Sequence, residues 1–303
     1  MRKLLLLPLL LLPQLLSAES LSSQHEQLWK KLEKSLEKME RDFDGAAGIH
    51  LIDLESGEEI AVNSGDVYPA ASTIKIAILA ELVRQNGSRA SKTAKLADVY
   101  AVDADDLVGG AGLLHLMTPE VTRLSNRDLA VLMMGLSDNS ATNVLIDRLG
   151  IERINELLEE HDFSQMRLRR KMMDTKAAAE GKENLASPRE LALFLANLER
   201  GEILERDATS EFRSLLATPK ETPFQRLLPA GAVLDSKSGE LEGVRNEVGI
   251  MRAPHRTFVL AVMTSHAANE RGAEELLSRI ALRVWETAEL FSRASEHGRL
   301  NRN

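Results

Sequence analysis

The sequence of 303 residues contains no cysteine. This absence excludes cysteine nucleophiles, thiolate metal sites and disulfide bridges, so a hydrophobic core must stabilise the fold. Apolar residues make up 44% of the chain, which at this length can supply such a core. Histidine pairs at metal-ligand spacing are also missing, because the seven histidines are scattered along the chain. We therefore expect neither a metal nor a cofactor.

Positive charge is in the minority, and the sequence lacks a phosphate-binding loop. The glycine-rich run Gly109-Gly110-Ala111-Gly112 is not followed by the Lys or Ser/Thr that such a loop needs, and it predicts a bend. The net charge is −8, and the chain without Arg2 and Lys3 has 36 basic residues against 46 acidic ones. This balance argues against nucleic acid or an anionic membrane surface as a partner.

Long apolar runs are missing except at the N-terminus, where residues 1–18 have the pattern of a secretory signal peptide. Two basic residues precede an almost unbroken Leu/Pro stretch from Leu4 to Leu16, and Ser17-Ala18 offers a cleavage site after Ala18. The stretch is too short to span a bilayer comfortably, and an uncleaved anchor is the alternative. We predict an exported protein, periplasmic or secreted, that does not contact the membrane after cleavage.

Hydrophobic periodicity predicts strands at both ends of the mature chain and helices between them. Residues 28–43 have the spacing of an amphipathic helix, and residues 46–54 and 59–63 predict two strands joined by a hairpin. From residue 72 to about residue 216 the pattern is mostly helical, and Ser187-Pro188-Arg189-Glu190 predicts a capping box that opens a helix.

Strand patterns return after Pro229. Residues 233–238, 245–251 and 257–264 predict strands, and residues 272–291 predict a closing helix. This order predicts one α/β domain that is interrupted by an all-helical domain. We place the α/β domain at residues 24–64 and 217–295, the all-helical domain at residues 65–216, and a frayed tail at residues 296–303.

Ser72-Thr73-Ile74-Lys75 is the motif that carries chemistry. Residues three apart share one face of a helix, so the Lys75 amine can reach the Ser72 hydroxyl if a helix starts here. A serine at a helix start also lies among unpaired backbone N–H groups, which favour the negative charge of an attacked oxygen. The second copy of this spacing, Ser35 to Lys38, lies among charged residues and reads as a solvated helix face.

Two further triplets follow in the chain. Ser137-Asp138-Asn139 lies between two predicted helices, and Lys237-Ser238-Gly239 lies on a predicted strand. Taken alone, the first would be a polar turn that caps a helix, and the second a strand that ends in a bend. Asp138 is expected to hydrogen-bond nearby backbone. In this order, however, the three motifs resemble those of the class A serine β-lactamases and the penicillin-recognising enzymes related to them.

The resemblance covers nearly the whole mature chain and implies an α/β (α+β) fold. In this fold an antiparallel sheet is flanked by N- and C-terminal helices, and an inserted all-helical domain lies alongside. The resemblance also implies roles for single residues. Ser72 would be the acylated nucleophile, Lys75 would help to accept its proton, and Ser137 would relay a proton to the leaving ring nitrogen. Asn139 would orient Lys75 and donate to the amide side chain of the substrate.

The strand motif is expected to bind the other end of the substrate. Lys237 and Ser238 would hold its carboxylate, and Gly239 would leave room for it against the strand. The backbone N–H groups of Ser72 and Glu240 would form the oxyanion hole. Arg245 is a tentative further ligand of the carboxylate, with a plain surface arginine as the alternative.

The sequence departs from the family in one segment. Class A enzymes carry Glu-x-x-Leu-Asn in a loop before the helix that starts here near Pro188, and residues 168–184 lack this motif. Glu180 and Asn184 have the right mutual spacing but lie too close to Pro188. Asp174 is the other candidate for the deacylation base, although it could equally pair with Arg169 or Arg170.

The resulting expectation is a β-lactamase that acts through an acyl-enzyme on Ser72. Two alternatives remain: a D-Ala peptidase or esterase, like a penicillin-binding protein with slow deacylation, and a non-catalytic periplasmic binding or sensing module. The substrate would be a small β-lactam or a cell-wall peptide, and a monomer is the default assembly.

Overall fold

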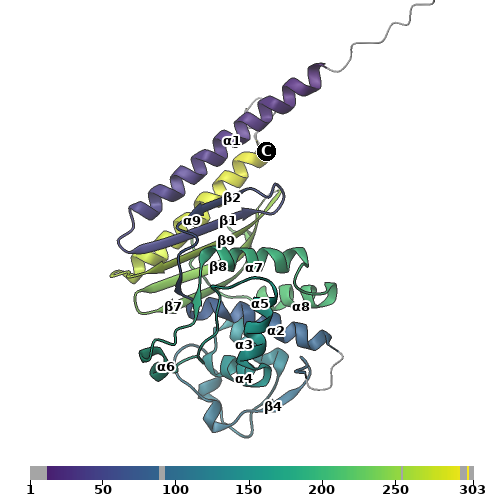
Figure 1. Ribbon diagram of the computed structural model, residues 1–303, viewed down its shortest axis with the longest axis vertical. Helices are drawn as coiled ribbons and strands as arrows, with labels where there is room; N and C mark the ends of the chain where they lie inside the picture. Colours follow the sequence, from purple (N-terminus) through teal and green to yellow (C-terminus); the bar gives the residue numbers. More distant parts are fainter. Residues whose placement is uncertain (1–11, 89–92, 254, 294–298, 300–303) are drawn as a thin grey trace, which may run out of the picture.

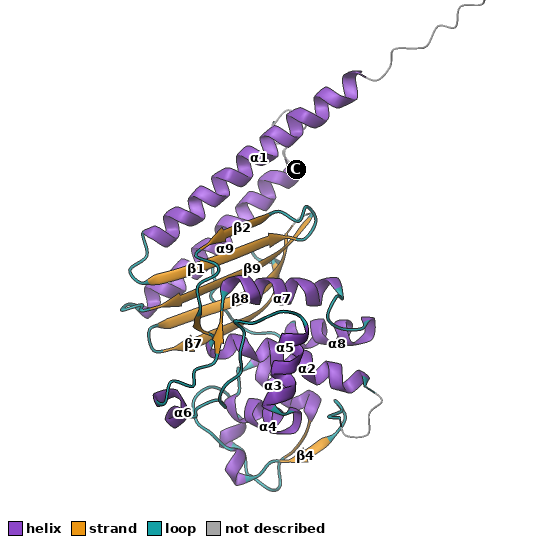
Figure 2. Ribbon diagram, viewed as in Figure 1, coloured by secondary structure: helices purple, strands orange, loops and turns teal. Residues whose placement is uncertain are grey.

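The central element of the fold is a five-stranded antiparallel sheet. The computed structural model describes residues 12–88, 93–253, 255–293 and 299, with side chains from residue 24 onward. The strands run in the order β2-β1-β9-β8-β7, so both ends of the chain contribute to one sheet (Figure 2). Their bounds are β1 (Ala46–Asp53), β2 (Glu59–Val62), β7 (Val233–Leu241), β8 (Val244–Ala253) and β9 (Arg256–Ser265). The mixed fold with an antiparallel sheet, expected from the resemblance, is confirmed.

Both faces of the sheet are covered because its inner strands are apolar on both sides. Successive side chains of a strand point to opposite faces. In β9, Phe258 and Leu260 belong to the core beneath the terminal helices, whereas Val259 and Ala261 belong to the core shared with the middle of the chain. The terminal helices are α1 (Leu12–Arg41) and α9 (Glu270–Arg293), which lie side by side against one face (Figure 1).

The segment between β2 and β7 is mostly helical, as predicted. Its helices are α2 (Lys75–Gly87), α3 (Asn126–Gly135), α4 (Asn139–Leu149), α5 (Ile151–Glu160), α6 (Thr175–Ala179), α7 (Pro188–Arg200) and α8 (Arg206–Leu216). Short strand pairs join β3 (Tyr68–Pro69) to β6 (Leu185–Ala186) and β4 (Val99–Ala101) to β5 (Arg123–Ser125). α7 packs on the sheet, whereas α2 packs against α4, α5 and α8. The exact domain borders stay a prediction.

The predicted capping box at α7 forms only in part. The Ser187 side chain accepts the Glu190 N–H at 3.2 Å, and Pro188 occupies the first helical position. The Glu190 carboxylate, however, accepts the backbone N–H groups of Ser164, Gln165 and Met166 instead of returning to the N-cap. The Glu190 carboxylate therefore binds the loop at residues 164–166 and not the N-cap backbone of its own helix. These hydrogen bonds attach α7 to that loop.

The chain termini lie largely outside the described residues. Residues 1–11 of the predicted signal peptide are among those not described, and residues 12–18 form the beginning of α1. The helix predicted at residues 28–43 is thus longer on its N-terminal side. The predicted tail at residues 296–303 is not described except at residue 299. None of the helices in the described part of the chain is long and apolar enough to cross a membrane.

Candidate active site

A cleft of about 1040 Å³ opens between the edge strand β7 and the helical segment. All three sequence motifs contribute to it, together with segments that sequence analysis did not single out. The residues that line it are Pro69, Ala71, Ser72, Gly110, Ala111, Met134, Gly135, Leu136, Ser137, Asn139, Arg170, Met172, Met173, Thr175, Ala178, Glu183, Asn184, Lys220, Glu221, Lys237, Ser238, Gly239, Glu240, Leu241, Glu242 and Val244.

Ser72 lies where the chain enters a largely buried helix, α2. A 3-10 helix at Ala71–Ile74 runs directly into α2, so Ser72 and Lys75 are one turn apart, as the spacing predicts. Ala71 adopts a left-handed φ of 50°, which is unusual for a residue with a Cβ. Such strained backbone is often found beside reacting groups, because the surrounding structure must enforce it.

The Lys75 amine is completely buried and uses its hydrogen-bond donors within the site. It donates to the Ser137 carbonyl at 2.6 Å, to the Ser137 hydroxyl at 3.1 Å and to the Asn139 side-chain oxygen at 3.1 Å. Burial lowers the pKa of Lys75 well below its ordinary value, and the nearby positive charge of Lys237 lowers it further. A lysine in this environment gives up its proton more readily than an exposed lysine does.

Ser137 and Asn139 are positioned by the turn between α3 and α4. Ser137 adopts a left-handed φ of 53°, which turns the chain into α4. The buried Asp138 carboxylate accepts the N–H groups of Leu113, Leu114 and Ala141, so it has the backbone-binding role expected for it. α4 then starts at Asn139. The side-chain amide nitrogen of Asn139 donates to the Gly109 carbonyl at 3.2 Å.

The third motif forms the opposite wall of the cleft. Lys237 is 1% exposed, and its amine donates to the Ser238 carbonyl at 2.6 Å. Burial lowers the pKa of Lys237 to about 7, with Lys220 adding to the effect and Glu247 opposing it. Gly239 lies directly against the nucleophile segment, because a Cβ at this position would be 2.8 Å from the backbone nitrogen of Ser72. Only glycine allows this approach without a backbone shift.

The structure does not bring the tentative bases to the cleft. The Asp174 carboxylate caps α6 by accepting the Ala177 N–H at 2.9 Å, and Asp174 is not among the described residues that line the cleft. Glu180 is exposed and pairs with Lys182. The pairing of Asp174 with Arg170 does not occur either, because Arg170 pairs with Glu183. Both carboxylates bind local partners, which are the Ala177 N–H for Asp174 and the Lys182 amine for Glu180.

Arg245 is likewise not among the cleft residues, although it is not a surface arginine. Arg245 is 8% exposed. Its guanidinium pairs with two carboxylates of α9, that of Glu270 at 2.5 Å and that of Glu274 at 3.4 Å. Its guanidinium also donates to the carbonyls of Leu241 and Val244. These partners use its donors within the fold, and the tentative role of Arg245 as a carboxylate ligand stays a prediction.

Several cleft residues were missed by the sequence analysis because no local pattern marks them. Lys220 reaches the cleft from the loop after α8, and Arg170 and Glu183 reach it as an ion pair with a separation of 2.7 Å. Met172 and Met173 line the cleft from residues 168–184, the segment in which the family carries its deacylation base. Asn143 fixes this wall, since its side chain exchanges two hydrogen bonds with the backbone of Met172, at 2.8 and 3.1 Å.

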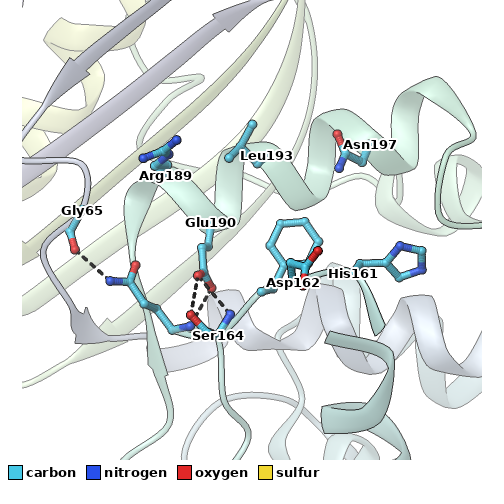
Figure 3. A pocket seen from close by; sticks show the side chains of 10 residues that line it. Gly65, His161, Asp162, Ser164, Arg189, Glu190, Leu193 and Asn197 are labelled. Atoms are coloured by element: carbon cyan, nitrogen blue, oxygen red, sulfur yellow. Dashed lines mark hydrogen bonds between the residues drawn. The ribbon is translucent and has the colours of Figure 1, made fainter. Parts of the chain in front are cut away.

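A second hollow of about 430 Å³ shares no residue with the Ser72 cleft (Figure 3). Its most prominent acid, Glu190, accepts N–H groups of the loop that includes Ser164 and Gln165, and the Gln165 amide donates to the Gly65 carbonyl at 3.1 Å. These polar groups hold a loop against α7. Within the residues that the structure describes, no group of His, Asp or Glu side chains is arranged to hold a metal ion.

The Ser72 cleft brings together the hydroxyl groups of Ser72 and Ser137 and the buried amine of Lys237. The buried amine of Lys75 contacts the Ser137 hydroxyl. Such an arrangement suits the transfer of an acyl group to serine, because the amines can exchange protons with the nucleophile and the leaving group. The same amines provide positive charge for an anionic substrate.

Comparison with known proteins gives consistent results. The model of the beta-lactamase enzyme family matches residues 30–288. Beta-lactamase 1 from Streptomyces cacaoi is 24% identical over 272 residues, which cover 83% of this chain and 82% of that protein. The crystal structure of a beta-lactamase from Sphaerobacter thermophilus has a TM-score of 0.76 at 27% identity and covers 86% of this chain and 97% of its own.

A second solved structure is that of PBP-A, with a TM-score of 0.75 and 26% identity, covering 84% of this chain and 95% of its own. A leucine-to-glutamate mutant of PBP-A, also 26% identical, was solved as an acyl-enzyme complex with penicillin G; its TM-score is 0.76, and 85% and 96% of the two chains are covered.

Proposed function

Since this chain belongs to the beta-lactamase enzyme family, we propose that it is a serine hydrolase that opens β-lactam rings through an acyl-enzyme on Ser72. The observation that carries this proposal is the position of the Lys75 amine, one helical turn from Ser72 and hydrogen-bonded to Ser137 and Asn139. Burial disfavours the charged form of this amine even though it has three polar partners, and groups perturbed in this way cluster at functional sites.

In the proposed acylation, the Ser72 hydroxyl oxygen bonds to the β-lactam carbonyl carbon while Lys75 accepts the hydroxyl proton. The carbonyl oxygen becomes negatively charged, and the backbone N–H groups of Ser72 and Glu240 would stabilise it. The close approach of Gly239 to Ser72 supports this geometry, because it brings the two backbone segments together. The bond from the carbonyl carbon to the ring nitrogen then breaks.

The leaving nitrogen needs a proton when that bond breaks. Ser137 is the proposed donor, since its hydroxyl lies 3.1 Å from the Lys75 amine and can be resupplied by it. Lys237 and Ser238 would hold the substrate carboxylate, and Asn139 would donate to the amide side chain. The burial of Lys237 supports this role, because the interaction of opposite charges is stronger away from water.

We propose that the second step, hydrolysis of the acyl-enzyme, is slow. Hydrolysis requires a base that activates water, and the wall formed by residues 168–184 contributes Met172 and Met173 to the cleft. The acid of this wall that does line the cleft, Glu183, is paired with Arg170. This arrangement favours a persistent acyl-enzyme, as in the penicillin-binding alternative.

The proposal is tested by mass spectrometry after exposure to penicillin G. The expected result is one adduct on Ser72 of the wild-type protein, absent in Ser72→Ala, that decays over many minutes. A wild-type protein without an adduct would overturn the acylation proposal. Rapid decay, together with steady hydrolysis of a chromogenic cephalosporin, would overturn slow deacylation and favour an efficient β-lactamase.

The two remaining alternatives have distinct outcomes. Release of D-alanine from a muropeptide would identify a peptidase that acts on the cell wall. Reversible ligand binding that Ser72→Ala leaves unchanged would identify a binding module. We further propose that the protein acts as an exported monomer after cleavage behind Ala18, which N-terminal sequencing and size-exclusion chromatography of the mature protein test.

A further inference from the structure

Lys220 is a cation of the cleft that no sequence motif explains. It follows α8 and lines the same cleft as Ser72 and Lys237. Its amine donates to the Leu216 carbonyl at 2.6 Å and to the Ser236 carbonyl at 3.0 Å. A lysine ammonium has three N–H donors, so these two carbonyls leave one donor for the cleft.

A buried carboxylate stands behind this lysine. Glu247 of β8 is fully buried, and it accepts the Ser236 hydroxyl at 2.6 Å and the Phe224 N–H at 2.9 Å. Ser236 therefore connects the two charged groups, with its carbonyl bound to Lys220 and its hydroxyl bound to Glu247. The next residue along β7 is Lys237, so three ionisable side chains meet around one short stretch of strand.

The two lysines disfavour each other's charged form. Lys220 adds to the burial that lowers the pKa of Lys237 to about 7. Burial lowers the pKa of Lys220 to about 8, and Glu247 acts in the opposite direction on both lysines. An anion in the cleft would favour the charged form of both lysines, so the arrangement suits an anionic ligand.

We propose that Lys220 is a second cation for the substrate carboxylate, held in place by Glu247 through Ser236. Glu247 is then a positioning residue, since it acts through Ser236 and the two lysines and does not itself line the cleft. This inference rests on the proposed acylation of Ser72. The shared chemistry of the ligand is a carboxylate, carried either by a β-lactam or by the C-terminus of a peptide.

The geometry explains why Lys220 takes the place expected for Arg245. The guanidinium of Arg245 is bound to α9 by Glu270 and Glu274. Lys220 comes from the loop after α8, donates to the Ser236 carbonyl of β7 and lines the cleft. The carboxylate end of the cleft thus draws its second positive charge from a different part of the chain.

The test measures the rate constant of Ser72 acylation by penicillin G, by penicillin G methyl ester and by a thioester depsipeptide with a free C-terminal carboxylate. In Lys220→Met the acylation by the two acids is expected to slow by at least about tenfold, because a charged hydrogen bond is lost. Acylation by the neutral ester is expected to change by less than about twofold. The acid that loses more rate identifies the carboxylate source.

Three further variants separate an effect of charge from a folding defect. Lys220→Gln keeps a donor for the two carbonyls without the charge, so it tests the proposal even if Lys220→Met folds poorly. Glu247→Gln should slow the acids more than the ester, which a purely structural defect would not do. Lys30→Met removes an exposed lysine of α1 and should leave all three rates unchanged.

The outcomes separate the two levels of the proposal. Equal rates for wild type, Lys220→Met and Lys220→Gln with both acids would overturn the role of Lys220 while Ser72 acylation stands. Equal losses for acids and ester would also overturn it, since charge would not be involved. A wild-type protein that no compound acylates would overturn the proposed function, and this inference with it.

Discussion

The Lys75 amine donates to both the carbonyl and the hydroxyl of Ser137, at 2.6 and 3.1 Å, across 62 residues of sequence. This double contact joins the start of α2 to the turn before α4. The Asn139 side-chain oxygen is the third partner of the amine. The proposed acylation uses the neutral amine, whose lone pair takes the Ser72 proton. The proton-exchanging amine is therefore oriented by the same turn that supplies the proposed proton donor to the leaving group.

Replacement of Lys75 by methionine is expected to slow acylation of Ser72 by about 10²- to 10⁴-fold, the range that positioned acid and base groups contribute. The variant also leaves the Ser137 carbonyl without this partner. Stopped-flow acylation with a chromogenic cephalosporin measures the effect. Lys182→Met, which removes an exposed lysine paired with Glu180, serves as the control and should react like wild type. Unchanged acylation in Lys75→Met would show that another group accepts the proton.

Gly239→Ala is expected to slow acylation by about 10²-fold, because misplacement near 1 Å at a reacting centre has effects of this size. The added Cβ would lie 2.8 Å from the backbone nitrogen of Ser72 and 3.0 Å from that of Thr73. Gly65→Ala is the matched control, since a Cβ there meets no heavy atom within 4 Å. If the two variants acylate at the same rate, the close approach has no role in the reaction.

Met172→Glu is expected to speed the decay of the acyl-enzyme by about 10²-fold, the lower range for a general base. Met172 is 7% exposed and lines the cleft, and Asn143, one helical turn beyond Asn139, fixes its backbone. The decay of the penicillin G adduct is followed by mass spectrometry. Met172→Gln has the same shape without a base and should leave the decay slow. Equal decay rates in the two variants would rule out this wall as the place where a base is missing.

The stability of the wild-type protein is expected to fall more steeply than that of Glu247→Gln as the pH rises from about 4.5 to about 7. Burial raises the pKa of Glu247 to about 7, so the folded state binds its proton more tightly than the unfolded state does. The resulting stabilisation is complete at low pH and disappears as the pH passes through the raised pKa. Urea unfolding at a series of pH values measures the slope.

Glu274→Gln is the contrasting variant for that experiment. Hydrogen bonds from Arg226 and Arg245 lower the pKa of Glu274, so its contribution is present above its ordinary pKa and disappears as the pH falls. Glu274→Gln should therefore leave the slope between about pH 4.5 and about pH 7 unchanged and should change the pH dependence of stability only below about pH 4.5. A wild-type slope between about pH 4.5 and about pH 7 that Glu247→Gln leaves unchanged would contradict a raised pKa at Glu247.

Local patterns in the sequence were sufficient for much of the fold. The strands at residues 46–53, 59–62 and 256–265 match their predicted ranges within a few residues. β2 alternates exposed and buried residues, whereas β1 and β9 are short, almost continuously buried runs bounded by turns, and both patterns are visible in the sequence. The link between Ser72 and Lys75 was also predictable, since one helical turn fixes their separation. The reciprocal capping box at Glu190 was wrong, because a partner distant in sequence, the loop at residues 164–166, competed successfully for its carboxylate.

The sequence by itself determined the Ser72–Lys75 segment, the order of the three motifs and the mixed architecture, since these depend on patterns along single helices and strands. The tertiary structure decided which charged side chains reach the cleft. Asp174, Glu180 and Arg245 found partners near their own elements, whereas Lys220 and Glu247 meet at Ser236 from two separate segments. Charge pairing in a buried site depends on which elements pack together, and spacing along the chain does not encode that choice.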